Sequence, residues 1–389
     1  MGKPIDDIFV VWVTTFVTML GVGLIAPLMA IYAQSLGATN LEVGIIFGSF
    51  ALARTMAQLP VGSLSDVYGK KIFMVIGTLF YGISTLFYNF VSTIAGLLVV
   101  RVFTGVFSSF ITPVAGSYVA TIAPKARMGE YMGVFNSAIT LGLGVGPLVG
   151  GTLADIYGIE APFYVCGILG ILASIIAYTR LKDINVYGGS EENSIGEVMK
   201  INRLFSLEFL KNRNFLASFI INVSNMMINA SVMAYLALYA IQYGVTPTYV
   251  GFMIATMNFL MAFLQKRFGI LYDKIGSRVI IFGIAIMVSG IYLLSMSDSF
   301  IKMLFSLITA AIGASISAPA VMSLAINEIP LNRKGEAMGL FTTSINVGIF
   351  VGAISSGIIA DYLGITNMYK VAALFSLIVS TVGYLLIEK

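Results

Sequence analysis

Two arginines inside otherwise apolar segments are the residues of this chain that could most plainly do chemistry. Arg101 lies in the apolar stretch 94–121, and Arg54 lies in the stretch 41–61. An arginine in the middle of a membrane span is costly unless it is paired or faces water, so Arg101 is a candidate binding site for an anionic group. A structural hydrogen bond to helix carbonyls is the alternative. Arg54 lies nearer the end of its stretch, where its side chain is able to reach the membrane surface.

Residues that usually carry catalysis or bind metals are scarce. The chain has no histidine and a single cysteine, Cys166, so we expect no metal site, no disulfide and no cofactor. No Asp or Glu lies deep in an apolar stretch, although proton coupling needs a group that titrates in a changing environment. Glu42 and Glu130 are the remaining candidates for that group, and a structural role at a helix end is the alternative for both. No Walker motif is present, so ATP is not expected to be the energy source.

The composition excludes a water-soluble globular domain. Of 389 residues, 58% are hydrophobic and 10% are charged, and the mean hydropathy is +0.95. The 40 glycines suit a tightly packed membrane bundle, because glycine lets helices approach closely. Twelve apolar stretches are long enough to cross a bilayer: 8–33, 41–61, 72–90, 94–121, 130–154, 162–180, 214–243, 248–268, 279–297, 301–327, 336–359 and 367–387.

Basic residues predict the orientation of these spans. Of the 22 Lys and Arg residues, 18 fall on the side that holds both termini, two lie inside spans, and only Lys302 and Lys370 fall on the opposite side. The positive-inside rule therefore predicts that both termini are cytoplasmic. The longest non-spanning segment, 181–213, is predicted to be a cytoplasmic linker between six spans and six. Its later part, from 195 to 215, is either plain linker or a helix that lies along the membrane surface.

One turn occurs twice, about half the chain apart. Residues 62–71 read GSLSDVYGKK and residues 269–278 read GILYDKIGSR. The glycines are expected to allow a tight turn and close packing. Each aspartate is placed to face a helix N-terminus or a basic residue, and this contact is expected to hold one conformation of the protein, as a latch, and to break in the other. A simple charged turn is the alternative. The candidate gating residues are Gly62, Asp66, Gly69, Lys70 and Lys71 in the first copy and Gly269, Asp273, Gly276 and Arg278 in the second.

The two halves of the sequence repeat each other beyond this turn. Pro113 and Pro319 are 206 residues apart, as are Pro124 and Pro330. The sequence DIYG at 155–158 matches DYLG at 361–364 at the same separation. Two six-span halves of the same orientation imply a pseudo-two-fold axis along the membrane normal, with the substrate site near the midplane.

The repeated turn resembles the signature loop between spans two and three of the major facilitator superfamily, and Arg101 with Gly105 resembles that family's arginine motif. The segment 142–151, GLGVGPLVGG, is similar to the glycine–proline motif of span five in the drug/proton antiporters, which is associated with exporters. Val67 and Thr121 depart from the family pattern, which often has arginine and an acidic residue there. Smooth glycine faces let helices slide, although ordinary close packing is the alternative; the motif residues are Gly142, Gly146, Pro147, Gly150 and Gly151.

In the superfamily, spans one, four, seven and ten line a central cavity, so the resemblance implies which polar residues meet the substrate. From these spans they are Arg101, Thr18, Thr104, Ser108, Asn222, Asn225 and Asn229, and neighbouring spans add Asn136, Asn258 and Asn346. The three asparagines of span seven recur at i, i+3 and i+7, which places them on one helix face. Hydrogen bonds between helices are an equally open role for that stripe.

We therefore expect an all-α integral membrane protein of the major facilitator fold. Its predicted parts are an N-terminal six-helix bundle (1–180), a linker (181–213) and a C-terminal six-helix bundle (214–389). The expected function is export of lipophilic or drug-like small molecules by alternating access. The sequence leaves open whether this export is coupled to proton antiport. Transport or flipping of a lysophospholipid or another amphipathic anion is the alternative, and a membrane sensor or enzyme is disfavoured. We expect a monomer of the cell membrane that contacts membrane lipid and no nucleic acid.

Overall fold

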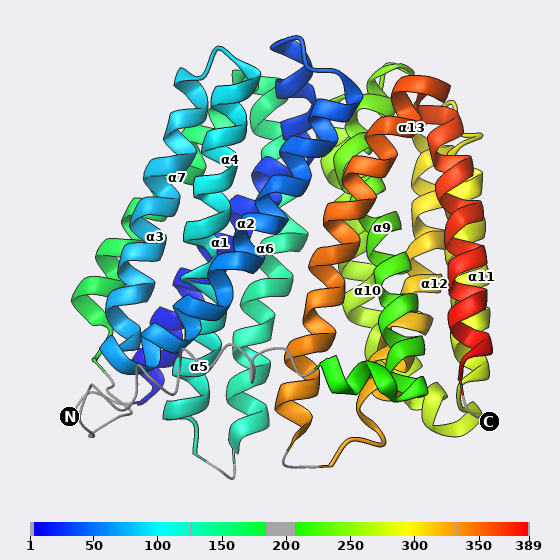
Figure 1. The fold of residues 1–389 in the computed structure, drawn as a ribbon. Helices are drawn as coiled ribbons and strands as arrows, with labels where there is room; N and C mark the ends of the chain where they lie inside the picture. Colours follow the sequence, from blue (N-terminus) through cyan, green and yellow to red (C-terminus); the bar gives the residue numbers. More distant parts are fainter. Residues whose placement is uncertain (1–3, 125–126, 184–206, 331–332, 388–389) are drawn as a thin grey trace. The chain divides into compact units, whose positions relative to one another are not determined.

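The computed structural model describes residues 4–124, 127–183, 207–330 and 333–387, and this part of the chain contains helices and no strand. The side chains of some helical residues, Asp66 and Asp273 among them, are not described. Helices are expected here because a span surrounded by lipid must satisfy its own backbone hydrogen bonds. They are α1 (Pro4–Ser35), α2 (Asn40–Tyr68), α3 (Lys70–Phe87), η1 (Tyr88–Phe90), α4 (Ile94–Ser109), α5 (Thr112–Ile122), α6 (Met128–Tyr157), α7 (Ala161–Arg180), η4 (Leu207–Lys211), α9 (Arg213–Ile241), α10 (Pro247–Ile275), α11 (Arg278–Leu294), α12 (Phe300–Ile326) and α13 (Lys334–Leu385) (Figure 1).

The described helices account for the predicted membrane spans. Ten helical stretches are long and apolar enough to cross a bilayer, and α11 is a shorter apolar helix. The stretch within α13 is 49 residues long, or about 70 Å at 1.5 Å per residue, which exceeds twice the thickness of the hydrocarbon core. At Gly364 its backbone leaves the helical region, with φ 79° and ψ 159°, so α13 is two arms. With α11 and two arms of α13, the described residues give twelve passes.

The predicted span 94–121 is divided in the structure. Helix α4 ends at Ser109 and α5 begins at Thr112, with Pro113 in its first turn. Proline is favoured in a first turn because its missing N–H has no helical partner there, whereas further inside a helix it removes a hydrogen bond. The proline at 113 therefore starts a new helix instead of continuing α4.

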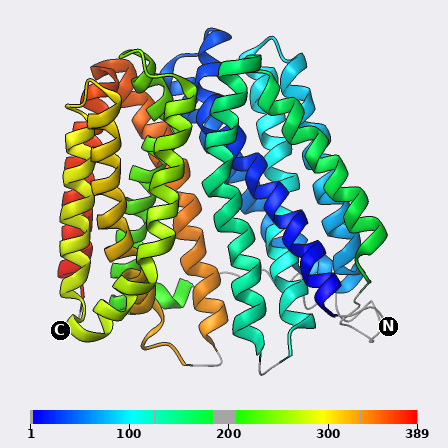
Figure 2. The same ribbon diagram turned by 180° about the vertical axis from the view of Figure 1, so that it is seen from behind.

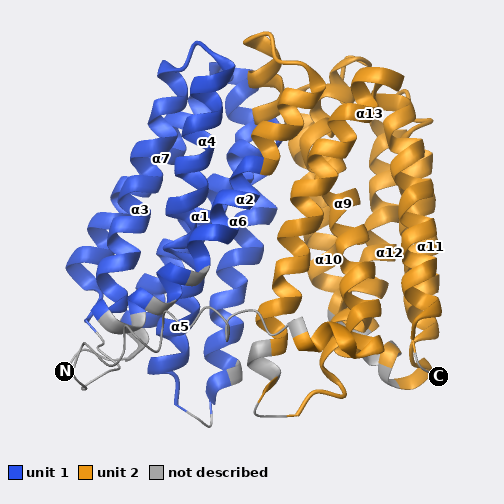
Figure 3. Ribbon diagram, viewed as in Figure 1, with its two compact units in different colours: residues 1–28, 49–201 blue, residues 29–48, 202–389 orange. Residues whose placement is uncertain are grey.

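The helices group into two compact units (Figure 3). Unit 1 contains residues 1–28 and 49–201, and its helices run alongside one another in both views (Figures 1 and 2). Its core is apolar and draws on α1, α2, α3, α5, α6 and α7; Val11, Met74, Val114 and Tyr118 are fully buried there. Burial of such side chains by neighbouring helices holds the bundle together through packing.

Unit 2 contains residues 29–48 and 202–389, and α9 is its most enclosed helix. Every residue from Ala234 to Ala240 is buried, on all sides of the helix. A helix that is apolar and buried all round must be surrounded by other helices. Within unit 2, α9 packs on both arms of α13 and also contacts α10 and α12.

The predicted linker falls largely on residues 184–206, outside the described part of the chain, so the bundle boundaries at 180 and 214 stay predictions. Its described end is attached to unit 2. In η4, Glu208 forms an ion pair with Arg333 at 3.3 Å, and the Arg333 guanidinium lies 4.6 Å from the ring centroid of Phe209. Glu328 accepts hydrogen bonds from the side-chain amides of Asn212 (3.0 Å) and Asn214 (2.6 Å), which ties the start of α9 to the end of α12.

Candidate functional site

Arg101 is buried inside unit 1, as expected of an arginine that does not face lipid. Helix α4 is capped by Thr93, whose hydroxyl accepts from the Gly96 N–H at 3.1 Å, and two turns later it presents Arg101, 6% exposed. The guanidinium lies 5.2 Å from the centroid of the Phe50 ring on α2. A cation over an aromatic face is stabilised by the ring quadrupole, and more so where water is excluded. This position places the guanidinium group in the interior of unit 1.

Arg54 is the second cation of this unit. It is half-buried, and its Nη2 atom lies 3.4 Å from the hydroxyl of Thr112, the first residue of α5. The side chain is therefore directed to the break between α4 and α5. Both intramembrane arginines belong to unit 1, and Arg101 reaches α2 through Phe50 whereas Arg54 reaches α5.

Several hydroxyls of the predicted cavity set bond to their own helices. Thr18 donates to the Thr14 carbonyl at 2.8 Å, and Ser108 donates to the Gly105 carbonyl at 2.7 Å; both side chains are buried. Thr104 donates to the Arg101 carbonyl at 3.0 Å and lies 2.9 Å from the hydroxyl of Tyr88, which joins α4 to η1. These contacts give the three hydroxyls structural partners.

The three asparagines of α9 have different surroundings although they share a face. The Asn222 amide donates to the hydroxyl of Ser344 on α13 at 2.7 Å, which is the interhelical role left open by the sequence. Asn225 is 6% exposed, and its Oδ1 atom has no hydrogen-bond partner in the part of the chain that the structure describes. Asn229 is half-buried. Of the other predicted asparagines, Asn136 on α6 is exposed, while Asn258 on α10 and Asn346 on α13 are half-buried.

Asn225 and Asn229 line a cavity of about 50 Å³ among α9, α10, α11 and α12. We call it the methionine cavity because four methionines contribute to it: Met226, Met257, Met261 and Met287. Its remaining lining residues are Ile228, Val232, Ile291, Ala310, Ala311, Ala314 and Ala318. Among the described lining residues, only the two asparagines have polar side chains. Methionine is flexible and polarizable, and it adapts to varied apolar partners.

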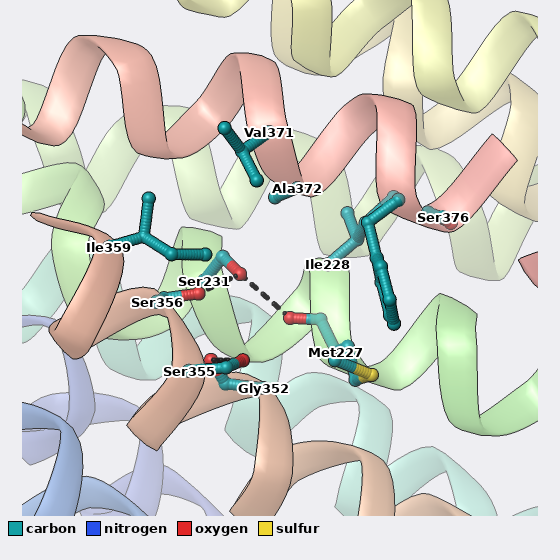
Figure 4. A pocket seen from close by; sticks show the side chains of 11 residues that line it. Met227, Ile228, Ser231, Gly352, Ser355, Ser356, Ile359, Val371, Ala372 and Ser376 are labelled. Atoms are coloured by element: carbon teal, nitrogen blue, oxygen red, sulfur yellow. Dashed lines mark hydrogen bonds between the residues drawn. The ribbon is translucent and has the colours of Figure 1, made fainter. Parts of the chain in front are cut away.

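A second cavity of unit 2, of about 140 Å³, lies between α9 and the two arms of α13 (Figure 4). Serines line it, but their hydroxyls are already engaged. Ser231 lies 2.6 Å from the hydroxyl of Ser356 and donates to the Met227 carbonyl at 2.8 Å. Ile359, Val371, Ala372 and Phe375 make up much of the remaining wall.

The repeated turn is shorter than the sequence predicts, because α2 continues to Tyr68 and α10 to Ile275. Gly69 (φ 97°) and Gly276 (φ 70°) end these helices in the left-handed region, where glycine is favoured. The expectation for Gly62 was wrong: it lies inside α2, and a Cβ there would meet no atom within 4 Å among the described residues, so it neither makes the turn nor packs closely.

The basic residues of the two turns lie in different surroundings. Lys70 begins α3 and is buried, whereas Arg278 begins α11 and is exposed. Lys71 lies over the ring of Tyr178, 5.5 Å from its centroid. The side chains of Asp66 and Asp273, and the surroundings of Gly269, lie outside the described part, so the proposed latch stays a prediction.

The glycine–proline segment lies against α1 inside unit 1. A Cβ added to Gly142 would lie 2.7 Å from the Met19 Cβ, and one added to Gly146 would lie 2.7 Å from the Leu20 carbonyl oxygen. Real Cβ contacts are not that short, so both positions require glycine. One turn further on, Gly150 meets the Leu24 carbonyl in the same way, and Pro147 lies beside Gly23. Gly151 is buried. The three glycines four residues apart form one helix face that admits the α1 backbone.

The proton-coupling candidates both have local partners. Glu42 accepts from the Thr39 N–H at 2.8 Å while the Glu42 N–H donates to the Thr39 hydroxyl at 3.2 Å, which is a capping box at the start of α2. Glu130 accepts two hydrogen bonds from Arg127, at 2.6 and 2.7 Å, and both side chains are more than half exposed. This partner raises the pKa of Arg127.

One contact of unit 2 was missed by sequence reasoning. The carboxylate of Asp361 on α13 accepts hydrogen bonds from the backbone N–H groups of Asn40 and Leu41, both at 3.0 Å. These two N–H groups lie in the first turn of α2, where they lack helical partners. The Tyr235 hydroxyl adds contacts to the carbonyls of Asn40 (2.8 Å) and Ala353 (3.0 Å). The available signal was Asp361 itself, which the repeat matches to Asp155 at the end of a span.

The acidic residues of the described part lie mostly near the surface. Asp7 is the one carboxylate in the buried class among the described residues, and it pairs with Lys182 at 3.5 Å. The described residues contain no group of three or more His, Cys, Asp or Glu that could hold a metal ion.

Comparison with known proteins gives relatives over the whole chain. The family model of the Major Facilitator Superfamily matches residues 11–343 and 218–389. A protein of Methanocaldococcus jannaschii described as an uncharacterized MFS-type transporter is 65% identical over 389 residues, all of both chains. Multidrug resistance protein 1 of Bacillus subtilis is 25% identical over 93% of this chain and 91% of its own. Quinolone resistance protein NorA of Staphylococcus aureus is 25% identical over 91% of this chain and 90% of its own.

Solved structures with the same fold include a bacterial homolog of the human lysosomal transporter Spinster, with a TM-score of 0.81, 14% identity and coverage of 99% of this chain and 97% of that one. The human organic anion transporter MFSD10 matches with a TM-score of 0.66 and 14% identity, over 100% of both chains. At these identities the similarity concerns the fold alone.

Proposed function

Because this chain belongs to the major facilitator superfamily, it is a membrane transporter and not an enzyme, and we propose that it exports lipophilic, drug-like small molecules by alternating access. The observation that supports the proposal is the methionine cavity, which has adaptable apolar walls, two asparagines and no charged side chain among its described lining residues. Ligand pockets of this composition favour lipophilic compounds, since polar groups are few and fix orientation. The names of the relatives from Bacillus subtilis and Staphylococcus aureus agree with a drug substrate.

The export direction is inferred from the segment 142–151, which resembles the motif of exporters. The close contact of Gly142, Gly146 and Gly150 with α1 supports a role for this segment as a smooth helix face. A smooth face lets α6 shift along α1 when the transporter changes conformation, because no side chain interlocks the two backbones.

Alternating access requires contacts that are made in one state and lost in another. The hydrogen bonds of Asp361 and Tyr235 to the start of α2 suit this role in our proposal. They join residues that are far apart in the sequence and that belong to different predicted halves. We propose that these contacts hold one side of the transporter closed and separate when that side opens.

The test is flux of a fluorescent lipophilic cation in proteoliposomes, with and without an imposed pH gradient. We expect protein-dependent movement that the gradient accelerates, and the control is vesicles without protein. If the gradient drives flux, we compare Glu42→Gln with Glu130→Gln, and loss of the gradient dependence in one variant identifies that residue as the proton carrier. If the protein is folded, as shown by a cooperative thermal transition, and the cation still does not cross the membrane, the drug-export proposal is contradicted.

Transport of a lysophospholipid or another amphipathic anion is the second candidate, and a specific observation favours it. Unit 1 contains two arginines inside predicted spans, the buried Arg101 and the half-buried Arg54. An anionic head group would neutralise a guanidinium in a site that excludes water. Flux of a fluorescent lysophospholipid in the same vesicles, without flux of the cation, is the result that would select this candidate.

The setting of the protein is also part of the proposal. The strong bias of Lys and Arg supports a cell-membrane protein with both termini in the cytoplasm. We propose that it acts as a monomer whose partners are a small lipophilic substrate and membrane lipid. The flux experiment with a pH gradient decides whether protons are a further partner. No role for nucleic acid is proposed.

A further inference from the structure

We propose that the methionine cavity is a subsite for an apolar or aromatic group that carries an N–H or O–H donor, which the Oδ1 atom of Asn225 accepts. The inference rests on the proposed function, because it specifies part of the substrate that the transporter binds. Three observations carry it: the unpartnered oxygen, the apolar wall around it and the size of the cavity.

The unpartnered oxygen is the first observation. Asn225 is 6% exposed, and its Oδ1 atom has no hydrogen-bond partner among the described residues. Asn222, one turn earlier on the same helix, bonds to Ser344 at 2.7 Å. A buried acceptor without a donor costs free energy comparable to a lost hydrogen bond. Such a group is retained at a cost to stability, and a ligand donor would remove that cost.

The wall determines which donor fits. Asn225 and Asn229 are the lining residues with polar side chains, and the rest of the cavity is methionine, alanine and branched aliphatic side chains. A carboxylate or phosphate would place its own acceptor oxygens against the Oδ1 atom of Asn225. Its negative charge would also lose its water, and the described lining residues include no cation to compensate. A neutral N–H or O–H group, or one N–H of a delocalised cation, supplies a donor to Asn225 without bringing a concentrated charge into the cavity. Methionine sulfur also makes favourable contacts with aromatic edges.

The size makes this a subsite. A cavity of about 50 Å³ holds a small part of a ligand, since pockets for whole drug-sized molecules are roughly 300–1,000 Å³. The remainder of the ligand therefore lies outside the methionine cavity.

The test compares two fluorescent rhodamine methyl esters that differ only in their amino groups. One has primary amines, and the other has the same nitrogens fully methylated, so both are lipophilic cations but only the first has N–H donors. Binding to the detergent-solubilised full chain is measured by fluorescence polarization. We expect the wild-type protein to prefer the N–H compound by about tenfold, the size of one net hydrogen bond.

Asn225→Leu is the decisive variant, because leucine keeps the approximate shape and removes the acceptor. It should abolish the preference by weakening the N–H compound alone, and it should not lower the Tm of the ligand-free protein. Asn222→Leu is the stability contrast: it breaks the bond to Ser344 and should lower the Tm.

Equal wild-type affinities, no binding of either rhodamine, or a preference that survives Asn225→Leu would overturn the inference. A lower Tm in Asn225→Leu would also overturn it, since the oxygen would then have a structural partner. These outcomes concern binding in detergent, so they are separable from the proposed function, which fails only if flux is absent.

Discussion

At the scale of single residues, Arg101 poses the sharpest choice between the two candidate substrates. Its guanidinium is buried and lies over the Phe50 ring. An anionic head group would gain a charge-assisted hydrogen bond there. A lipophilic cation would gain nothing from this side chain.

We therefore predict that Arg101→Ala lowers transport of a fluorescent lysophospholipid by about 10- to 100-fold, which corresponds to one charge-assisted hydrogen bond. The same variant should leave the flux of a lipophilic cation within about twofold, because the cation has no favourable contact with an arginine. Both rates are measured in proteoliposomes. Survival of both activities would assign Arg101 a purely structural role.

At the scale of helices, the contact between α6 and α1 depends on glycine at particular positions. A Cβ at Gly146 would lie 2.7 Å from the Leu20 carbonyl oxygen, whereas a Cβ at Gly133, on the same helix, would meet no described atom within 4 Å. The two glycines thus form a matched pair on α6. Both have a helical backbone, but only Gly146 lies against another helix.

We predict that Gly146→Ala destabilises the protein by about 1–3 kcal/mol, because the two backbones must separate. Gly133→Ala should be neutral or should stabilise by about 0.5–1 kcal/mol, because alanine is the better helix former. The measurement is thermal unfolding of the purified protein in detergent. Equal effects of the two substitutions would refute the assignment of this face to the α1 contact.

The start of α2 offers a second prediction at this scale. Removing the Asp361 carboxylate leaves the N–H groups of Asn40 and Leu41 without their acceptor and costs about 1–2 kcal/mol, as for a lost helix cap. Asp361→Ala should therefore release this end of α2 more often. We expect faster maleimide labelling of a cysteine placed at Val43, which is 2% exposed.

Two features make this labelling experiment clean. The native Cys166 is buried, so it contributes little background. Asn367→Ala is the control, because among the contacts of the described residues its side-chain amide donates only to the Leu363 carbonyl, across the Gly364 break in α13, and not to α2. A labelling rate at Val43→Cys that Asp361→Ala leaves unchanged would argue against the contact as a gate.

At the scale of the whole molecule, the positive-inside pattern yields a topology that a single experiment checks. Lys302 is predicted to face the outside and Lys211 the cytoplasm, and both side chains are exposed. In intact cells, a membrane-impermeant maleimide should label Lys302→Cys and should reach Lys211→Cys only after permeabilisation. The reverse pattern would invert the proposed orientation.

The pair at the predicted outer end is sensitive to acid. Lys302 lowers the pKa of Asp298 through a hydrogen bond of 2.8 Å. A lowered native pKa contributes stability above the ordinary pKa of aspartate, and that stability is lost as the pH falls through the native value. The pair is exposed, so its contribution to stability is small.

The sequence by itself determined the class, the spans and the repeat. Span length, hydropathy and the bias of basic residues are properties of consecutive residues, so the twelve passes and the glycine turns at 69 and 276 needed no knowledge of the fold. The family resemblance also rested on such local motifs, and the family model confirmed it. Gly62 shows the limit of local reasoning, because the length of α2 placed it inside a helix.

Only the tertiary structure decided which partner each polar residue has. Asn222, Asn225 and Asn229 share a periodic face, yet Ser344, 122 residues from Asn222, satisfies one of them and leaves the Asn225 oxygen unpartnered. Asp361 meets the start of α2 across 321 residues of sequence. Helical periodicity fixes the direction in which a side chain leaves its own helix. The neighbour it meets depends on how distant helices pack, and that packing sets the unpartnered oxygen and the methionine wall on which recognition depends.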